Sequence, residues 1–182
     1  MAIKTKNIME KLIKDSETFQ KERPLTITNE QRNEVLKEVA NDIIQWQLSK
    51  SSLEQIIADL DEVYSGSESG FEMAKELEDG YHTFGHYEVN SQLVELLESI
   101  DSLVDDFKRK NIQEWVKAHN IKPKFKIGDG FVLKNSPSYG FNIGEKVFIT
   151  MLNSENAYYC INKVENRNGG RVIVFEKLEQ CV

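Results

Sequence analysis

Apolar residues recur at helical spacing along the first two thirds of the chain. Their spacing of three and four residues predicts helices at 7–19, 28–48, 51–64, 69–80 and 90–120. Three of these helices start with the spacing of a capping box, in which a serine or threonine stands three residues before a glutamate or glutamine. The pairs are Thr28 and Gln31, Ser51 and Glu54, and Ser69 and Glu72.

The pattern changes after residue 121. Proline and glycine interrupt the helical spacing, and apolar residues then alternate with a period of two, which is typical of half-buried strands. Strands are predicted at 130–134, 145–152, 157–164 and 171–179, joined by turns rich in Asn and Gly. Four or five short strands favour a small closed barrel of the SH3-like kind, because closure removes exposed edges.

Charge divides the chain at the same place. Residues 1–121 hold 24 acids and 14 bases, whereas residues 122–182 hold 6 acids and 9 bases. The predicted fold is therefore α+β, with an acidic α-helical domain at 1–121 followed by a small SH3-like β-barrel domain at 122–182.

The negative charge is most concentrated between Ser51 and Asp106, where 15 acids face the single base Lys75. One interpretation is a solvated surface that maintains solubility. The other is a field that attracts a basic partner. For the second interpretation, the candidate partner-binding acids are Glu72, Glu76 and Asp79.

Two of the three histidines, His82 and His86, lie in the segment DGYHTFGHYEVN. Their spacing would suit a metal only in a helix, and the two glycines of the segment disfavour one. Together with Glu88 they are candidates for the acid–base pair of a metal-free ribonuclease, although the acidic surroundings would repel a phosphodiester. We favour a protein-contact loop, in which Tyr81 and Tyr87 contribute the buried area.

Basic and aromatic residues alternate where the second domain begins. Lys122, Lys124, Lys126 and Lys134 cluster there, and Tyr139 follows. Such interleaving is typical of a surface for single-stranded RNA. The alternative is a solvated sheet edge that the lysines protect from pairing with another chain.

Other chemistry is not indicated. The two cysteines, Cys160 and Cys181, lack metal-ligand spacing, and no stretch approaches the length of an apolar membrane span. Neither a metal nor a cofactor is predicted, and the N-terminal residues lack the apolar core of a signal peptide. These observations favour a cytoplasmic binding protein over an enzyme.

Two resemblances sharpen this interpretation. The stretches KFKIGDGFVLK, GFNIGEKVFI, YYCI and VFEKLE resemble SH3-like modules of Gram-positive phages and mobile elements. The stretch SGSESGFEMAKELEDGYHTFGHYEVNSQLVELLESID resembles a helical module found in anti-CRISPR proteins that inhibit the type II effector nuclease. The second resemblance is carried by Ser69, Gly70, Phe71, Ala74, Leu77, Glu78, Leu93, Val94, Glu95 and Leu97.

The helical resemblance implies an inhibitor that acts in the cytoplasm of the bacterial host. Its partner would be the type II CRISPR effector nuclease or the complex of that nuclease with guide RNA. Inhibition would follow from interference with guide assembly or from shortening of the guide RNA; an enzyme, if this is one, would be a ribonuclease acting on the guide. The alternative is a nucleic-acid-binding accessory protein of a phage or mobile element.

Overall fold

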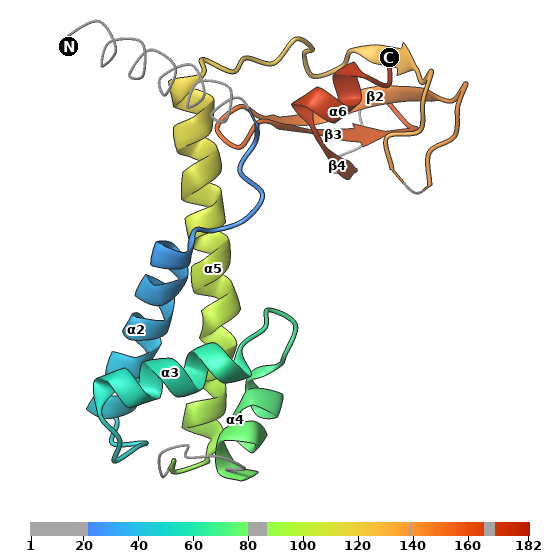
Figure 1. The fold of residues 1–182 in the computed structure, drawn as a ribbon. Helices are drawn as coiled ribbons and strands as arrows, with labels where there is room; N and C mark the ends of the chain where they lie inside the picture. Colours follow the sequence, from blue (N-terminus) through green and yellow to red (C-terminus); the bar gives the residue numbers. More distant parts are fainter. Residues whose placement is uncertain (1–21, 80–86, 139, 166–169) are drawn as a thin grey trace, which may run out of the picture. The chain divides into compact units, whose positions relative to one another are not determined.

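Helices precede a small antiparallel sheet in the computed structural model of the chain (Figure 1), which describes residues 22–79, 87–138, 140–165 and 170–182. The helices are α2 (Asn29–Gln45), α3 (Leu53–Val63), α4 (Gly70–Asp79) and α5 (Ser91–Ala118). The strands are β1 (Gly130–Val132), β2 (Lys146–Asn153), β3 (Tyr158–Asn162) and β4 (Arg171–Val174), and the short helix α6 (Phe175–Glu179) follows them. The α+β class is confirmed, while the helix predicted at 7–19 lies outside the described residues.

The chain forms two compact units, which we call the helical unit and the sheet unit. The helical unit comprises residues 25–110, and the sheet unit combines residues 111–182 with the segment that ends at Pro24. The division falls inside α5, whereas the sequence pattern places a boundary between residues 121 and 122. The reason is that Trp115 and Val116, on the last turns of α5, are buried in the core of the sheet unit.

One apolar core holds the helical unit together. Each helix buries one stripe of apolar side chains in this core. Fully burying a large aliphatic side chain contributes about 1.5–3 kcal/mol to the stability of the fold. The large side chains that are fully buried in this core are Leu36, Ile43, Ile56, Leu60, Met73, Leu77, Leu93, Leu97 and Ile100. Because α2 ends at Gln45, Trp46 occupies its C-cap and stays 54% exposed.

Two of the three predicted capping boxes are present. Thr28 and Gln31 exchange side-chain-to-backbone hydrogen bonds at the start of α2, and Ser69 and Glu72 do so at the start of α4. The box predicted from Ser51 and Glu54 is wrong by one residue. Ser52 caps α3, and its Oγ accepts the backbone N–H of Gln55 at 3.2 Å.

The sheet is an antiparallel meander in the order β1-β2-β3-β4. The strand predicted at 171–179 ends at Val174, and its second half is the helix α6. This prediction is wrong because Phe175 and Leu178 are both buried in the same core, and residues three apart share a face in a helix but not in a strand. The described strands form an open sheet in which β1 and β4 are the edges.

Residues after α6 return to the end of β1. The carbonyl of Cys181 accepts the backbone N–H of Lys134 at 2.7 Å, and the carbonyl of Gln180 accepts the Asn135 side-chain amide at 3.1 Å. Hydrogen bonds of this kind satisfy backbone N–H and C=O groups that would otherwise be left to water at an open sheet edge. They hold the last residues beside β1 without forming a fifth strand in the described part of the chain.

Arg23, which lies before the helical unit in the chain, contacts the turn between β2 and β3 and the helix α6. Its guanidinium donates to the carbonyl of Ala157 at 3.1 Å and to that of Asn156 at 2.6 Å. It also lies 3.5 Å from a carboxylate oxygen of Glu176 and over the ring of Trp115. Burial lowers the pKa of Arg23, and the neighbouring Glu176 opposes that shift.

Candidate functional site

The acids predicted to bind a partner lie together on α4. Glu72, Glu76 and Asp79 are all exposed, while the opposite face of the helix packs into the core. Glu72 also accepts hydrogen bonds from the backbone N–H and hydroxyl of Ser69, at 2.8 and 2.9 Å. These bonds lower the pKa of Glu72. One of the three acids therefore has a structural duty at the helix start, which leaves Glu76 and Asp79 as the clearer contact candidates.

Gly70 sets the distance between α4 and α5. A Cβ atom at this residue would lie 2.4 Å from the carbonyl oxygen of Val94 and 2.8 Å from the backbone nitrogen of Glu98. No side chain tolerates such approaches to backbone atoms, so only glycine permits this packing. The packing of α4 against α5 therefore depends on the absence of a side chain at residue 70.

A groove of about 480 Å³ lies beside this contact. One wall is a stripe of α4, and the other is the start of α5 with the residues before it. The lining residues are Phe71, Ala74, Lys75, Glu78, Val89, Asn90, Ser91 and Val94. Asn90 caps α5, since its side-chain oxygen accepts the backbone N–H groups of Gln92 and Leu93. Sequence reasoning did not find this groove, because it depends on how two separate segments pack.

The tyrosine- and histidine-rich segment is described only at its end. Tyr81, His82 and His86 lie outside the described residues. Tyr87 is half-buried, and its hydroxyl donates to a carboxylate oxygen of the buried Asp59 at 2.7 Å. Burial, followed by this hydrogen bond, raises the pKa of Tyr87. The side chain of Tyr87 therefore stabilises the helical unit.

Glu88, the third candidate for acid–base chemistry, is exposed, and its backbone N–H donates to the carbonyl of Leu48 at 2.7 Å. Next to this contact, Ser49 and Tyr87 form an isolated antiparallel bridge. These two contacts attach the residues after the segment to the loop between α2 and α3. In the described part of the chain, Glu88 contributes a backbone hydrogen bond, and no histidine of that part lies beside it.

A second tyrosine–carboxylate pair lies at the end of α3. The hydroxyl of Tyr64 donates to Asp101 of α5 at 2.8 Å, and the guanidinium of Arg32 lies 5.1 Å from the centre of the Tyr64 ring. Burial raises the pKa of Tyr64, and the hydrogen bond and charge of Asp101 add to the effect. The pair connects the end of α3 with α5.

The lysines predicted to contact RNA have different surroundings. Lys124 forms an ion pair with Glu179, and the ammonium group of Lys134 lies 3.4 Å from the carbonyl of Val182. Lys122 lines a shallow pocket of about 350 Å³ at the end of α5, and Lys126 is exposed. Tyr139 lies outside the described residues. Two of the four cations are thus engaged within the sheet unit itself.

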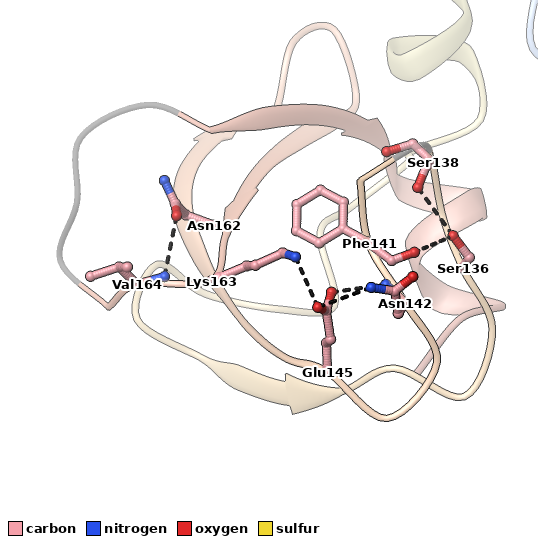
Figure 2. A network of polar contacts seen from close by, with 8 residues as sticks. All are labelled: Ser136, Ser138, Phe141, Asn142, Glu145, Asn162, Lys163 and Val164. Carbon is pink, nitrogen blue, oxygen red and sulfur yellow. Dashed lines mark hydrogen bonds and ion pairs between the residues drawn. The ribbon is translucent and has the colours of Figure 1, made fainter.

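Figure 2 shows a polar network on the sheet unit near Phe141. Glu145 accepts from the ammonium group of Lys163 at 2.8 Å and from the backbone N–H of Asn142 at 2.8 Å. The bond from Lys163 and that from Asn142 lower the pKa of Glu145 to about 2. Phe141 is buried beneath the Lys163 ammonium, 5.7 Å from it. This network neutralises Lys163 and fixes the loop before β2, so it offers little to an anionic ligand.

Metal and thiol chemistry gain no support from the described part of the chain. No group of three or more His, Cys, Asp or Glu there could hold a metal ion. Cys160 and Cys181 are free and buried, and burial raises the pKa of Cys160. Among the described helices, none has the length and apolar character needed to cross a membrane.

Comparison with known proteins gives no relative: no protein family, curated protein or solved structure matches the chain.

Proposed function

We propose that the chain is an inhibitory binding protein whose helical unit binds a basic partner through α4. The observation that carries this proposal is the combination of exposed acids with a groove on the same helix. Glu76 and Asp79 lie on α4, and Phe71 of the same helix lines the groove while 65% of it is exposed. A charged surface accelerates association with an opposite charge, and an apolar anchor supplies affinity.

As the partner we propose the type II CRISPR effector nuclease, alone or with its guide RNA. Such a nuclease holds nucleic acid in a positively charged channel, which an acidic helical surface would complement. The resemblance to the anti-CRISPR helical module supports this choice, since its residues make the α4–α5 pair. Ser69 caps α4; Gly70, Ala74, Leu77, Leu93 and Leu97 are buried; Phe71, Glu78 and Val94 line the groove. In this proposal the chain blocks guide assembly or brings about guide shortening in the host cytoplasm.

Co-purification tests the choice of partner. The effector nuclease is passed over the immobilised chain with and without guide RNA, and retained RNA is sized. We expect the nuclease to be retained, and retention that vanishes when guide RNA is already bound would indicate a block of guide assembly. Absence of retention in both conditions would contradict the proposed partner.

Charge reversal tests the surface. We expect Glu76→Lys with Asp79→Lys to slow association strongly at low salt while leaving the melting temperature nearly unchanged, because exposed carboxylates contribute little to stability. The matched control is Glu34→Lys with Glu38→Lys, two exposed acids of α2 that give the same change in net charge. Equal slowing by both pairs would mean that only the net charge matters, and the proposed surface would be wrong.

A second candidate function is nucleic-acid binding by the sheet unit, as in an accessory protein of a phage or mobile element. It is favoured by the exposure of Lys122 and Lys126 and by the excess of bases over acids after residue 121. This proposal includes a likeness of the sheet unit to SH3-like modules. The hydrogen bonds that bring residues 180 and 181 to the end of β1 support that likeness. Retention of plain RNA by the chain, falling steeply with added salt, would favour this candidate.

A further inference from the structure

Phe71 of α4 is not part of the apolar core of the helical unit. The buried face of the helix is complete with Met73, Ala74 and Leu77, each at most 2% exposed. Phe71 instead lines the groove and leaves 65% of its surface in water. Exposing a large aromatic side chain to water costs free energy, and a partner that covers the ring removes this cost.

The other apolar residues of the groove form a continuation of this surface. Val89 and Val94 are half-buried and line the opposite wall. The α4 wall is a helical stripe, since its residues stand at positions 71, 74, 75 and 78. A groove bounded by helical stripes accepts the apolar face of an amphipathic helix, with side chains at matching spacing.

Charge around the groove decides the character of the occupant. Inside it, Lys75 and Glu78 offset one another. Asp79 stands one turn after the lining residue Lys75 on α4, whereas Glu76 lies on the far side of that helix. On α5, the exposed Glu98 stands one turn after Val94 and lies against Gly70. On α5, the exposed Glu95 follows Val94 directly. An acidic helix or a nucleic acid would be repelled by this rim, whereas lysine and arginine side chains would be attracted.

We infer that the α4–α5 groove binds an amphipathic basic helix of the partner, with an apolar side chain packed on Phe71 and basic side chains facing Asp79, Glu95 and Glu98. The inference rests on the proposed function in that it names the chemistry of the partner at the same site. It makes no use of the identity of that partner.

The test uses the full chain and a synthetic peptide. The probe is a fluorescently labelled amphipathic helical peptide of leucine and arginine, and binding is followed by anisotropy. A leucine–glutamate peptide with the same spacing and a leucine–arginine peptide of scrambled order serve as references. We expect the ordered basic peptide to bind, and the acidic and scrambled peptides to bind at least about tenfold more weakly.

Three variants examine the groove itself. Phe71→Ala should weaken binding of the basic peptide by about tenfold or more, because it truncates the proposed anchor. Trp46→Ala is the matched control, since Trp46 is an exposed aromatic residue of α2 outside the groove, and it should leave binding unchanged. Lys75→Ala should leave binding unchanged or tighten it, because it removes the basic side chain among the described residues that line the groove.

Weaker binding by Lys75→Ala would overturn the inference, since the groove would then favour an acidic ligand. So would equal losses from Phe71→Ala and Trp46→Ala, or equal binding of ordered and scrambled peptides. Retention of the effector nuclease by the Phe71→Ala variant at full strength would refute the groove while leaving the proposed partner intact. Peptide binding without any retention of the nuclease would do the reverse.

Discussion

At the scale of single residues, Gly70 has little freedom to change. A methyl group there would approach the Val94 carbonyl oxygen to 2.4 Å, and this atom belongs to the backbone of α5. We expect Gly70→Ala to lower the free energy of unfolding by about 1–3 kcal/mol, because α4 must move away from α5. Urea unfolding measures the change, and Glu76→Ala on the exposed face of α4 is the control, with an expected effect within about 0.5 kcal/mol. An unchanged stability in Gly70→Ala would show that the two helices have room to separate freely.

The hydroxyls of Tyr64 and Tyr87, which donate to carboxylates, predict sensitivity to alkali. Burial, followed by hydrogen bonds to Asp101 and Asp59, raises the pKa of Tyr64 and of Tyr87 above the ordinary value of 10.0. A raised pKa in the folded state means that the stabilisation is complete below pH 10.0 and is lost as the pH rises above that value. The free energy of unfolding should therefore fall above that pH.

Denaturant unfolding across this range measures the fall. In the variant Tyr64→Phe with Tyr87→Phe the fall should be shallower, although the variant starts from a lower stability because two hydrogen bonds to carboxylates are lost. A slope identical to that of the unchanged chain would mean that other titrating groups, and not these two tyrosines, cause the alkaline loss.

At the scale of elements, the repeating apolar pattern was sufficient for α2 to α5, since each is long and buries one stripe. It failed at α6, because five residues are too few to distinguish a period of two from one of 3.6. It also missed the cap of α3, where neighbouring Ser51 and Ser52 both suit the position. The groove was beyond prediction for a different reason. Its walls are eleven or more positions apart in the chain, between Glu78 and Val89, and the packing of α4 against α5, which is close at Gly70, brings them together.

The helix α6 contributes buried side chains to the core of the sheet unit. Phe175 is 1% exposed, and its ring lies 4.3 Å from that of the buried Tyr159. We expect Phe175→Ala to lower the free energy of unfolding by about 3–5 kcal/mol, through the lost burial and the cavity left behind. Lys177→Ala, at an exposed position of the same helix, should have little effect. Comparable losses from both variants would show that helix propensity, and not burial of the ring, determines the stability of α6.

At the scale of the whole molecule, two separate cores predict two separable responses. Leu97 is fully buried in the helical unit and Ile161 is fully buried in the sheet unit. In the sequence of α5, exposed charged pairs follow the last buried residue of the helical core: Lys108 contacts Asp105, and Arg109 contacts Asp106. Leu97→Ala should therefore speed amide exchange mainly within residues 25–110, and Ile161→Ala mainly within 111–182, each by destabilising about 2–5 kcal/mol.

Mass spectrometry of exchanged fragments provides this measurement. Fragments from the unit without the substitution serve as the internal control in each variant. Uniform acceleration across both units in either variant would show that the chain opens as one cooperative body, and the division within α5 would then have no energetic meaning.

The contacts of Arg23 have a consequence for the order in which the protein is assembled on the ribosome. Chains fold as they emerge, at about 5–20 residues per second. Residues 25–110 contain every buried residue of the helical core, so this unit can fold before the strands have been synthesised. Arg23 is made before all of them, yet it donates to Asn156 and Ala157, which are synthesised more than a hundred residues later. Arg23 therefore stays without these two acceptors until residues 156 and 157 have been synthesised, by which time the helical unit can already have folded.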